Sequence, residues 1–190
     1  MSKQTKNTKS TKSAKNADDS FISKDAVASG SSAYMKLEKG DNKIRMISKP
    51  IEGYVEWIDK KPVRTPMSDG EPEATDEENP PRKFIAVAII DQTDGNVKIL
   101  EVTQQSVIKA IRALANNPDW GNPFTYDLNI NKSGEDLKTK YVVTPSPKKA
   151  LSKEAIKKAG EKPCALEQLF QGEDPWKTED ADEVTEYFFK

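Results

Sequence analysis

The chain has 190 residues, of which 35% are hydrophobic, and its mean hydropathy is −0.78. This composition suits one folded domain but is too polar for a chain that folds along its whole length, so we expect tails beside a core. The single cysteine and the lack of histidine exclude a disulfide framework and a zinc site made from cysteine and histidine. The formal net charge of −1 hides two oppositely charged ends, which indicates different partners for each.

The chain has no apolar segment of membrane-spanning length, and its lysine-rich start lacks the hydrophobic run of a secretory signal. The single cysteine fits a reducing compartment. We therefore expect a cytoplasmic protein that has no membrane partner.

Residues 1–33 consist mainly of lysine, serine, threonine, asparagine and small residues without sustained periodicity. Such a segment cannot bury enough apolar surface to offset the entropy of ordering, so it is predicted to be a disordered basic arm. Two interpretations stay open. The arm is either a solubilising tail or a flexible segment that meets phosphate groups or an acidic protein surface.

Two strands are predicted next, over residues 42–48 and 54–58. In the first, Ile44 and Met46 face one way while Lys43 and Arg45 face the other, which gives the strand a basic outer face. Pro50 separates the two strands. The aromatic residues of the second strand either pack in the core or, with lysines close by, form a base-stacking surface.

Residues 66–81 carry six carboxylates and four prolines but no cation, so neither a helix nor a strand is expected there. The carboxylate spacing matches no calcium-binding loop. The segment is predicted to be a solvated acidic loop whose charge could compete with phosphate for the nearby basic surface.

The stretch from Arg82 to Asn116 gives the clearest local prediction. The apolar run over 84–90 and the run over 97–103 read as two strands joined by an Asp94-Gly95 turn. A helix follows, capped by Thr103, with its apolar residues at helical spacing and Lys109 and Arg112 on its wet face. It ends at Asn116.

Two further strands are predicted over 124–130 and 138–144, with Phe124 and Tyr126 facing inward. Residues 150–172 contain two helix signals: Ser152 as the cap of the first helix and Pro163 at the start of the second. These helices either pack on the barrel or stay loose. The domain formed by residues 34–149 is therefore followed by a short helical segment.

Residues 173–190 form an acidic tail that also carries aromatic side chains. Because aromatic residues cannot find a core among so many carboxylates, the tail is interpreted as a peptide ligand for a basic, apolar-lined pocket, with plain disorder as the alternative. The residues assigned to partner binding are Trp176, Asp180, Asp182, Glu183, Tyr187, Phe188 and Phe189.

The order of elements favours an all-β domain with one or more helices. The strands are too short and too few for a sandwich. A small, partly open, five-stranded Greek-key barrel of the OB type fits best, with the basic arm before it and the acidic tail after it.

Five stretches together resemble single-stranded DNA-binding proteins of tailed bacteriophages. They are Tyr34–Pro50, Lys61-Pro-Val-Arg64, Ile99–Ile108, Pro118–Asp127 and Thr139–Pro145, and the likeness spans roughly residues 34–149. The resemblance implies an OB-fold protein that coats exposed single strands during phage DNA replication, recombination or repair.

The same resemblance implies a basic arm that promotes cooperative binding and an acidic tail that recruits replication proteins. Two departures matter. Some relatives carry a zinc-stabilised subdomain inserted in the barrel, whereas the acidic loop 66–81 lacks ligands, so no metal or cofactor is expected. Lys190 follows Phe189, so the compact acidic-aromatic ending of bacterial counterparts is not reproduced.

Coating a single strand requires cations that follow the backbone and flat side chains that accept any base. Trp57, Tyr54 and Phe84 are the predicted stacking residues, and Tyr141 is a weaker candidate. The predicted phosphate contacts are Lys43, Arg45, Lys49, Lys60, Lys61, Arg64, Arg82, Lys83, Lys98, Lys138 and Lys140. These cations are expected to cluster on the face opposite Ile44, Met46 and Val143. Sequence discrimination should be weak, and RNA is a possible ligand too.

Two alternatives come from other classes of protein. Asp91, Asp94 and Glu101 flank the hairpin and could hold a divalent cation for phosphodiester cleavage, but no histidine accompanies them as an acid–base group, so an enzyme is not expected. The other alternative is an adaptor of the replication machinery that binds other proteins through both charged ends and the barrel edge.

Overall fold

The computed structural model describes residues 33–176, so the predicted arm up to residue 32 and the tail from residue 177 lie outside the described residues. The described part of the chain forms one sheet of seven strands with all strand pairs antiparallel. The strands are β1 Gly40–Met46, β2 Ile51–Ile58, β3 Lys61–Pro66, β4 Arg82–Asp91, β5 Val97–Val102, β6 Leu128–Ser133 and β7 Lys140–Pro145.

The helical elements lie between and after these strands. The two α-helices are α2 Gln105–Asn116 and α3 Lys153–Gly160. The short 3₁₀ helices are η1 Met67–Asp69, η2 Pro123–Thr125, η3 Asp136–Lys138 and η4 Leu166–Gln171. No helix in the described range is both long and apolar enough to cross a membrane.

Strands β1 and β2 behave as one long strand that is interrupted around Pro50. Both pair with β4: Ile44 lies opposite Asp91 near one end, and Val55 lies opposite Arg82 at the other. Proline has no N–H to donate, so it breaks the ladder at this point. The Ser48 hydroxyl accepts a hydrogen bond from the N–H of Ala88 at 2.9 Å, so this N–H of β4 has a partner where the ladder is broken.

The strand order identifies an OB-type barrel. The order in the sheet is β3-β2-β4-β1-β6-β7, and β5 pairs with the other side of β4. With β1 and β2 counted as one bent strand, the barrel strands are β1/β2, β4, β5, β6 and β7, and α2 lies between β5 and β6 in the chain. The predicted all-β, OB-type fold is confirmed. Strand β3, which pairs with β2, is an addition that the sequence pattern did not predict.

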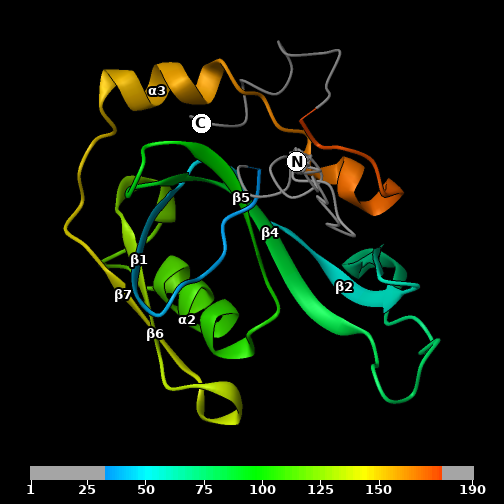
Figure 1. Ribbon diagram of the computed structural model, residues 1–190. Coiled ribbons are helices and arrows are strands. Elements are labelled where there is room, and N and C mark those ends of the chain that lie inside the picture. The colour runs from blue at the N-terminus through cyan, green and yellow to red at the C-terminus, as the bar shows by residue number, and fades with distance from the viewer. Residues whose placement is uncertain (1–32, 177–190) are drawn as a thin grey trace, which may run out of the picture.

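Strand β4 is buried on both faces and separates two apolar clusters. Ile85, Val87 and Ile89 point into a cluster that includes the buried face of α2. Ala86 and Ala88 point the other way, into a cluster covered by α3 and η4. Figure 1 shows α2 and α3 on opposite sides of β4 and β5. Residues 151–176 therefore pack on the barrel, which settles the alternative left open for the predicted helical segment.

Several predicted boundaries differ from the structure. Helix α2 has Gln104 at its N-cap without a side-chain cap, so the cap predicted at Thr103 is wrong. The strand predicted from 124 begins at Leu128, because Asn122 accepts a hydrogen bond from the Phe124 N–H and a 3₁₀ turn forms first. Ser152 does cap α3, accepting from the Ala155 N–H at 3.1 Å.

Candidate nucleic-acid interface

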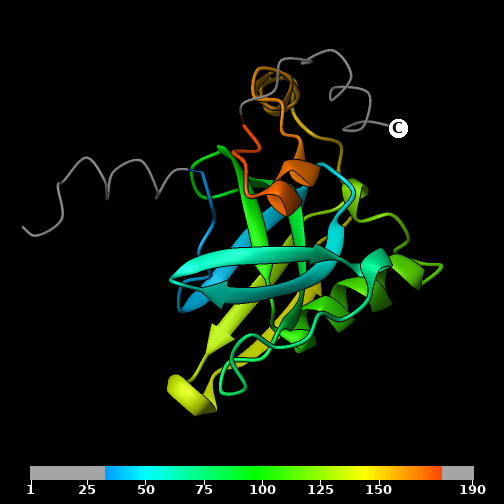
Figure 2. The ribbon, with the colours of Figure 1, turned by 90° about the vertical axis from the view of Figure 1, so that its right-hand side faces the viewer.

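The β2–β3 hairpin carries the most exposed aromatic ring in the described part of the chain. Trp57 lies opposite Pro62 near the end of β2, and 62% of its surface is exposed. Asp59 and Lys60 have φ angles of 49° and 63°, a left-handed pair typical of the tight turns that join antiparallel strands. This turn places Lys60 and Lys61 at the hairpin tip. Figure 2 shows β2 and β3 extending across the front of the barrel.

Arg82 stands beside this hairpin because β4 pairs with β2 at Val55. Neither Arg82 nor the two tip lysines forms an ion pair within residues 33–176. We call Trp57, Lys60, Lys61 and Arg82 the hairpin surface. A cavity of about 380 Å³ adjoins it, and its lining consists of Val55, Glu56, Trp57, Asn79, Pro80, Arg82 and Thr103.

The acidic loop forms one wall of this cavity through Asn79 and Pro80. The Asp76 carboxylate accepts hydrogen bonds from the Asn79 side chain and the Glu78 backbone, which lower the pKa of Asp76. The loop is also tied to β2, because the Thr75 N–H donates to the buried Glu56 carboxylate at 3.3 Å. Opposite charges therefore lie close together at this end of the molecule.

Three of the predicted phosphate contacts are largely buried and form short ion pairs within the chain. Arg45 is only 2% exposed and bonds Asp127, so its assignment to a wet basic face is wrong. Arg64 bonds Glu101 at 2.8 Å. The third, Lys98, bridges two carboxylates at the β4–β5 turn.

The ammonium of Lys98 lies 2.7 Å from both Asp91 and Asp94. Partial burial lowers the pKa of Lys98, but its hydrogen bonds to the two carboxylates more than offset this, so the pKa is raised. Asp91, Asp94 and Glu101, the residues of the nuclease alternative, are thus each paired with a cation. No group of three metal-ligating side chains lies within residues 33–176.

Two of the predicted stacking rings are covered. Tyr54 is 7% exposed, and the Lys83 ammonium lies 5.8 Å from its ring centroid. Phe84 is 1% exposed and packs against Phe170 of η4, with ring centroids 6.2 Å apart. The outer face of β4 and β5 is therefore closed by the chain's own C-terminal segment and is not open to a base.

Residues 151–176, which pack over this face, form the C-terminal cover, and Trp176 belongs to it rather than to a free tail. It packs against the second apolar cluster, and the Lys162 ammonium lies 4.1 Å from its ring centroid. The expectation that the tail aromatics find no core is wrong for Trp176. The other residues assigned to partner binding lie outside the described residues.

The remaining predicted cations are exposed but lie elsewhere. Lys43, on β1, lies 3.9 Å from Asp127. Lys138 and Lys140 lie at the β6–β7 end of the sheet. Lys49 lines a separate cavity next to α2. The structure thus brings Trp57 and Arg82 to one cavity, with Lys60 and Lys61 at the tip of the same hairpin, but it does not place the whole predicted set on one face. It adds Asn79, Pro80 and Thr103, which carried no sequence signal.

The fold and this site define a small OB-type barrel with a cationic hairpin that presents an exposed tryptophan. A probable ssDNA-binding protein of Escherichia phage T5 is 30% identical to this chain over 63 residues. The aligned stretch covers 33% of this chain and 24% of the phage T5 protein, so the match spans about a quarter of that relative. No protein-family model matches the chain, and no solved structure matches it significantly.

Proposed function

We propose that this protein binds single-stranded DNA without sequence preference and that the hairpin surface makes the principal contact. One observation carries the proposal: a tryptophan that is 62% exposed shares a cavity with Arg82 on a hairpin whose tip carries Lys60 and Lys61, and none of these three cations forms an ion pair within residues 33–176. The OB-type topology and the similarity to the phage T5 protein support it.

The chemistry of the hairpin surface fits an unpaired strand. The indole ring offers a flat face on which any base can stack, worth about 1–3 kcal/mol per base. Lys60, Lys61 and Arg82 can neutralise phosphates on either side of that base, and each such contact releases counterions. Neither interaction depends on the hydrogen-bonding edge of the base, so all four bases should bind with similar affinity.

In the cell this binding would coat and protect single strands during phage DNA replication, recombination or repair. The acidic residues after 176 would recruit replication or recombination proteins, and the basic arm would assist binding to the strand. The resemblance to phage single-stranded DNA-binding proteins supports these roles.

The proposal is tested by equilibrium binding to a mixed-sequence single strand, its duplex and the matching RNA over a range of salt concentrations. We expect the single strand to bind more tightly than the duplex, with an affinity that falls steeply as salt rises. Labelled strand incubated with protein and magnesium should stay intact. Equal affinity for duplex and single strand, or shortening of the strand, would contradict the proposed function.

A further inference from the structure

A second cavity, on the opposite side of β2 from Trp57, is not used by the proposed hairpin contact. It has a volume of about 310 Å³, which is in the lower range of small-molecule sites. Its apolar lining comes from the break between β1 and β2, from the inner face of α2 and from η2, and includes Met46, Pro50, Ile85, Ile108, Ile111 and Phe124.

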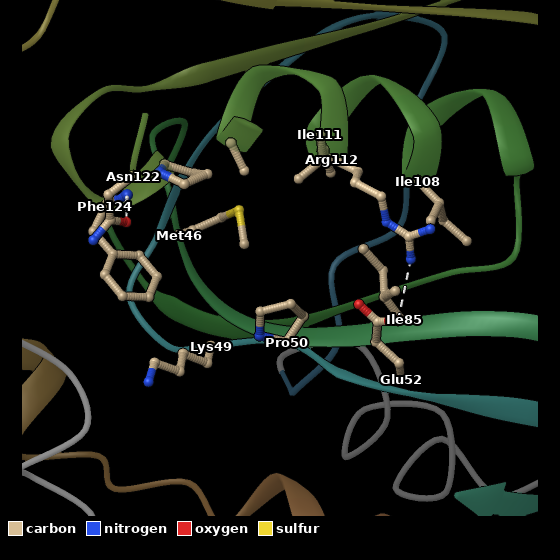
Figure 3. Close-up of a pocket in the computed structure, with 12 residues that line it drawn as sticks. Met46, Lys49, Pro50, Glu52, Ile85, Ile108, Ile111, Arg112, Asn122 and Phe124 are labelled. Carbon is tan, nitrogen blue, oxygen red and sulfur yellow. Dashed lines mark hydrogen bonds and ion pairs between the residues drawn. The ribbon is translucent and has the colours of Figure 1, made fainter. Parts of the chain in front are cut away.

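Polar groups are confined to the mouth of this cavity. Figure 3 shows Lys49 and Arg112 on opposite sides of it, with Met46 between them. Arg112 is held by Glu52 at 3.1 Å, whereas Lys49 has no ion-pair partner within residues 33–176. Cations therefore outnumber acids in the lining.

The segment that follows β7 passes the η2 side of the cavity. The backbone N–H of Lys149 donates to the carbonyl of Thr125, beside Phe124, and Lys149 is exposed. The cavity thus combines an apolar interior with a cationic rim, which suits an occupant that has an apolar body and negative charges attached to it.

Charge at the mouth narrows the choice of occupant. The Lys49 ammonium, the Asn122 amide N–H groups and the Arg112 N–H groups that Glu52 leaves free are donors that can meet phosphate and base-carbonyl oxygens. A single strand brings a negative charge with every base, whereas a peptide does so only at its acidic residues, so the cations at the mouth favour a nucleotide.

We propose that this cavity is a nucleobase pocket, in which one base of a bound single strand lies against Met46 and Phe124 while neighbouring phosphates meet Lys49 and Arg112. The proposal rests on the proposed function and extends it to the second side of β2. It gives the strand two separate anchors on the barrel, the exposed Trp57 ring and an apolar pocket.

The direct test uses the methyl group of Met46 as an NMR reporter in the full chain. A chain that carries Trp120→Phe and Trp176→Phe, so that Trp57 is its only tryptophan, is labelled with ¹³C at its methionine methyl groups, and oligo-dT is added while Trp57 fluorescence is followed in parallel. We expect the Met46 signal to shift because a base ring stacks near it, while the signal of Met67, on η1 and away from the cavity, stays in place.

The outcomes separate the two proposals. Quenched Trp57 emission with an unmoved Met46 signal overturns the base pocket and leaves the proposed function standing. No response in either probe overturns both. A shift of Met46 with an acidic, phenylalanine-containing peptide but not with oligo-dT shows a protein-docking site and also overturns the base pocket.

A matched pair of variants provides a second test. Ala115 lines the cavity and is exposed, so Ala115→Glu places an anion at the mouth without disturbing the core. It should weaken oligo-dT binding about five- to tenfold at low salt, and less as salt rises. Ala113 is also exposed on α2 but does not line the cavity, so Ala113→Glu should leave the affinity within about twofold. Equal effects of the two variants would contradict the proposal.

Discussion

Arg45 of β1 donates a hydrogen bond from Nε to Oδ1 of Asp127 at 2.7 Å, joining residues 82 positions apart in the chain. Its Nη1 also donates to the carbonyls of Phe124 and Lys149, at 3.3 and 2.9 Å. One buried guanidinium therefore ties β1 to η2 and to the segment that follows β7. A buried cation with this many internal partners supports the fold and is not exposed to a ligand.

Replacing Arg45 should mainly reduce stability. Arg45→Ala leaves the Asp127 carboxylate and two carbonyls without their partner, and we expect the free energy of unfolding to fall by about 3–5 kcal/mol, measured by urea denaturation. Lys43 lies 3.9 Å from the same carboxylate, but its side chain is 53% exposed. Lys43→Ala should therefore change the free energy of unfolding by less than about 1 kcal/mol. Similar small effects of both variants would show that the buried bond is not structural.

Replacing Trp57 should instead reduce binding. Trp57→Ala removes a mostly exposed ring, so stability should change little, whereas affinity for a mixed-sequence single strand should fall about 10- to 100-fold if one base stacks on it. Fluorescence anisotropy of a labelled oligonucleotide measures this. Ile156→Ala serves as the control because it removes a partly exposed apolar side chain on α3, outside the hairpin surface. The affinity of this variant for the oligonucleotide should stay unchanged.

The salt dependence of binding should distinguish free cations from paired ones. Lys60→Ala and Lys61→Ala should each make the plot of log affinity against log salt shallower by about 0.7, the contribution of one phosphate contact. Lys98→Ala should leave the slope unchanged because Asp91 and Asp94 already neutralise its ammonium. A shallower slope for Lys98→Ala would place that residue on the DNA.

The buried Cys164 thiol offers a probe of the C-terminal cover. Burial raises the pKa of Cys164 to about 12, so the thiol should react with a maleimide or disulfide reagent at pH 8 only after denaturant opens the cover. The neutral thiol favours the folded state. That contribution is complete below about pH 9, the ordinary value for this group, and is lost as pH rises toward 12. Rapid labelling of the native protein would show that residues 151–176 open readily.

The central part of the fold was predictable because its signals are local. The β4 and β5 strands, their turn at Gly95 and the apolar stripe of α2 are each specified by neighbouring residues. Strand β3 was missed because Lys61–Pro66 has no apolar alternation and forms a strand only through its pairing with β2. Tertiary pairing overrides local pattern in such segments.

The candidate site was harder to predict because exposure depends on distant segments. Alternation along β1 correctly separates Ile44 from Arg45, but it cannot show that Asp127 and the chain around Lys149 close over the arginine. In the same way, nothing near Phe84 indicates that Phe170 covers it. Trp57 stays exposed because it lies near the hairpin tip, beyond the reach of that cover.

The most direct measurement follows the emission of Trp57 alone during titration with single-stranded DNA. In a chain carrying Trp120→Phe and Trp176→Phe, Trp57 is the only remaining tryptophan. Binding through the hairpin surface predicts saturable quenching by oligo-dT that is reversed by added salt. Emission that stays unchanged at low salt, over concentrations that saturate binding measured independently, would contradict the role assigned to this surface.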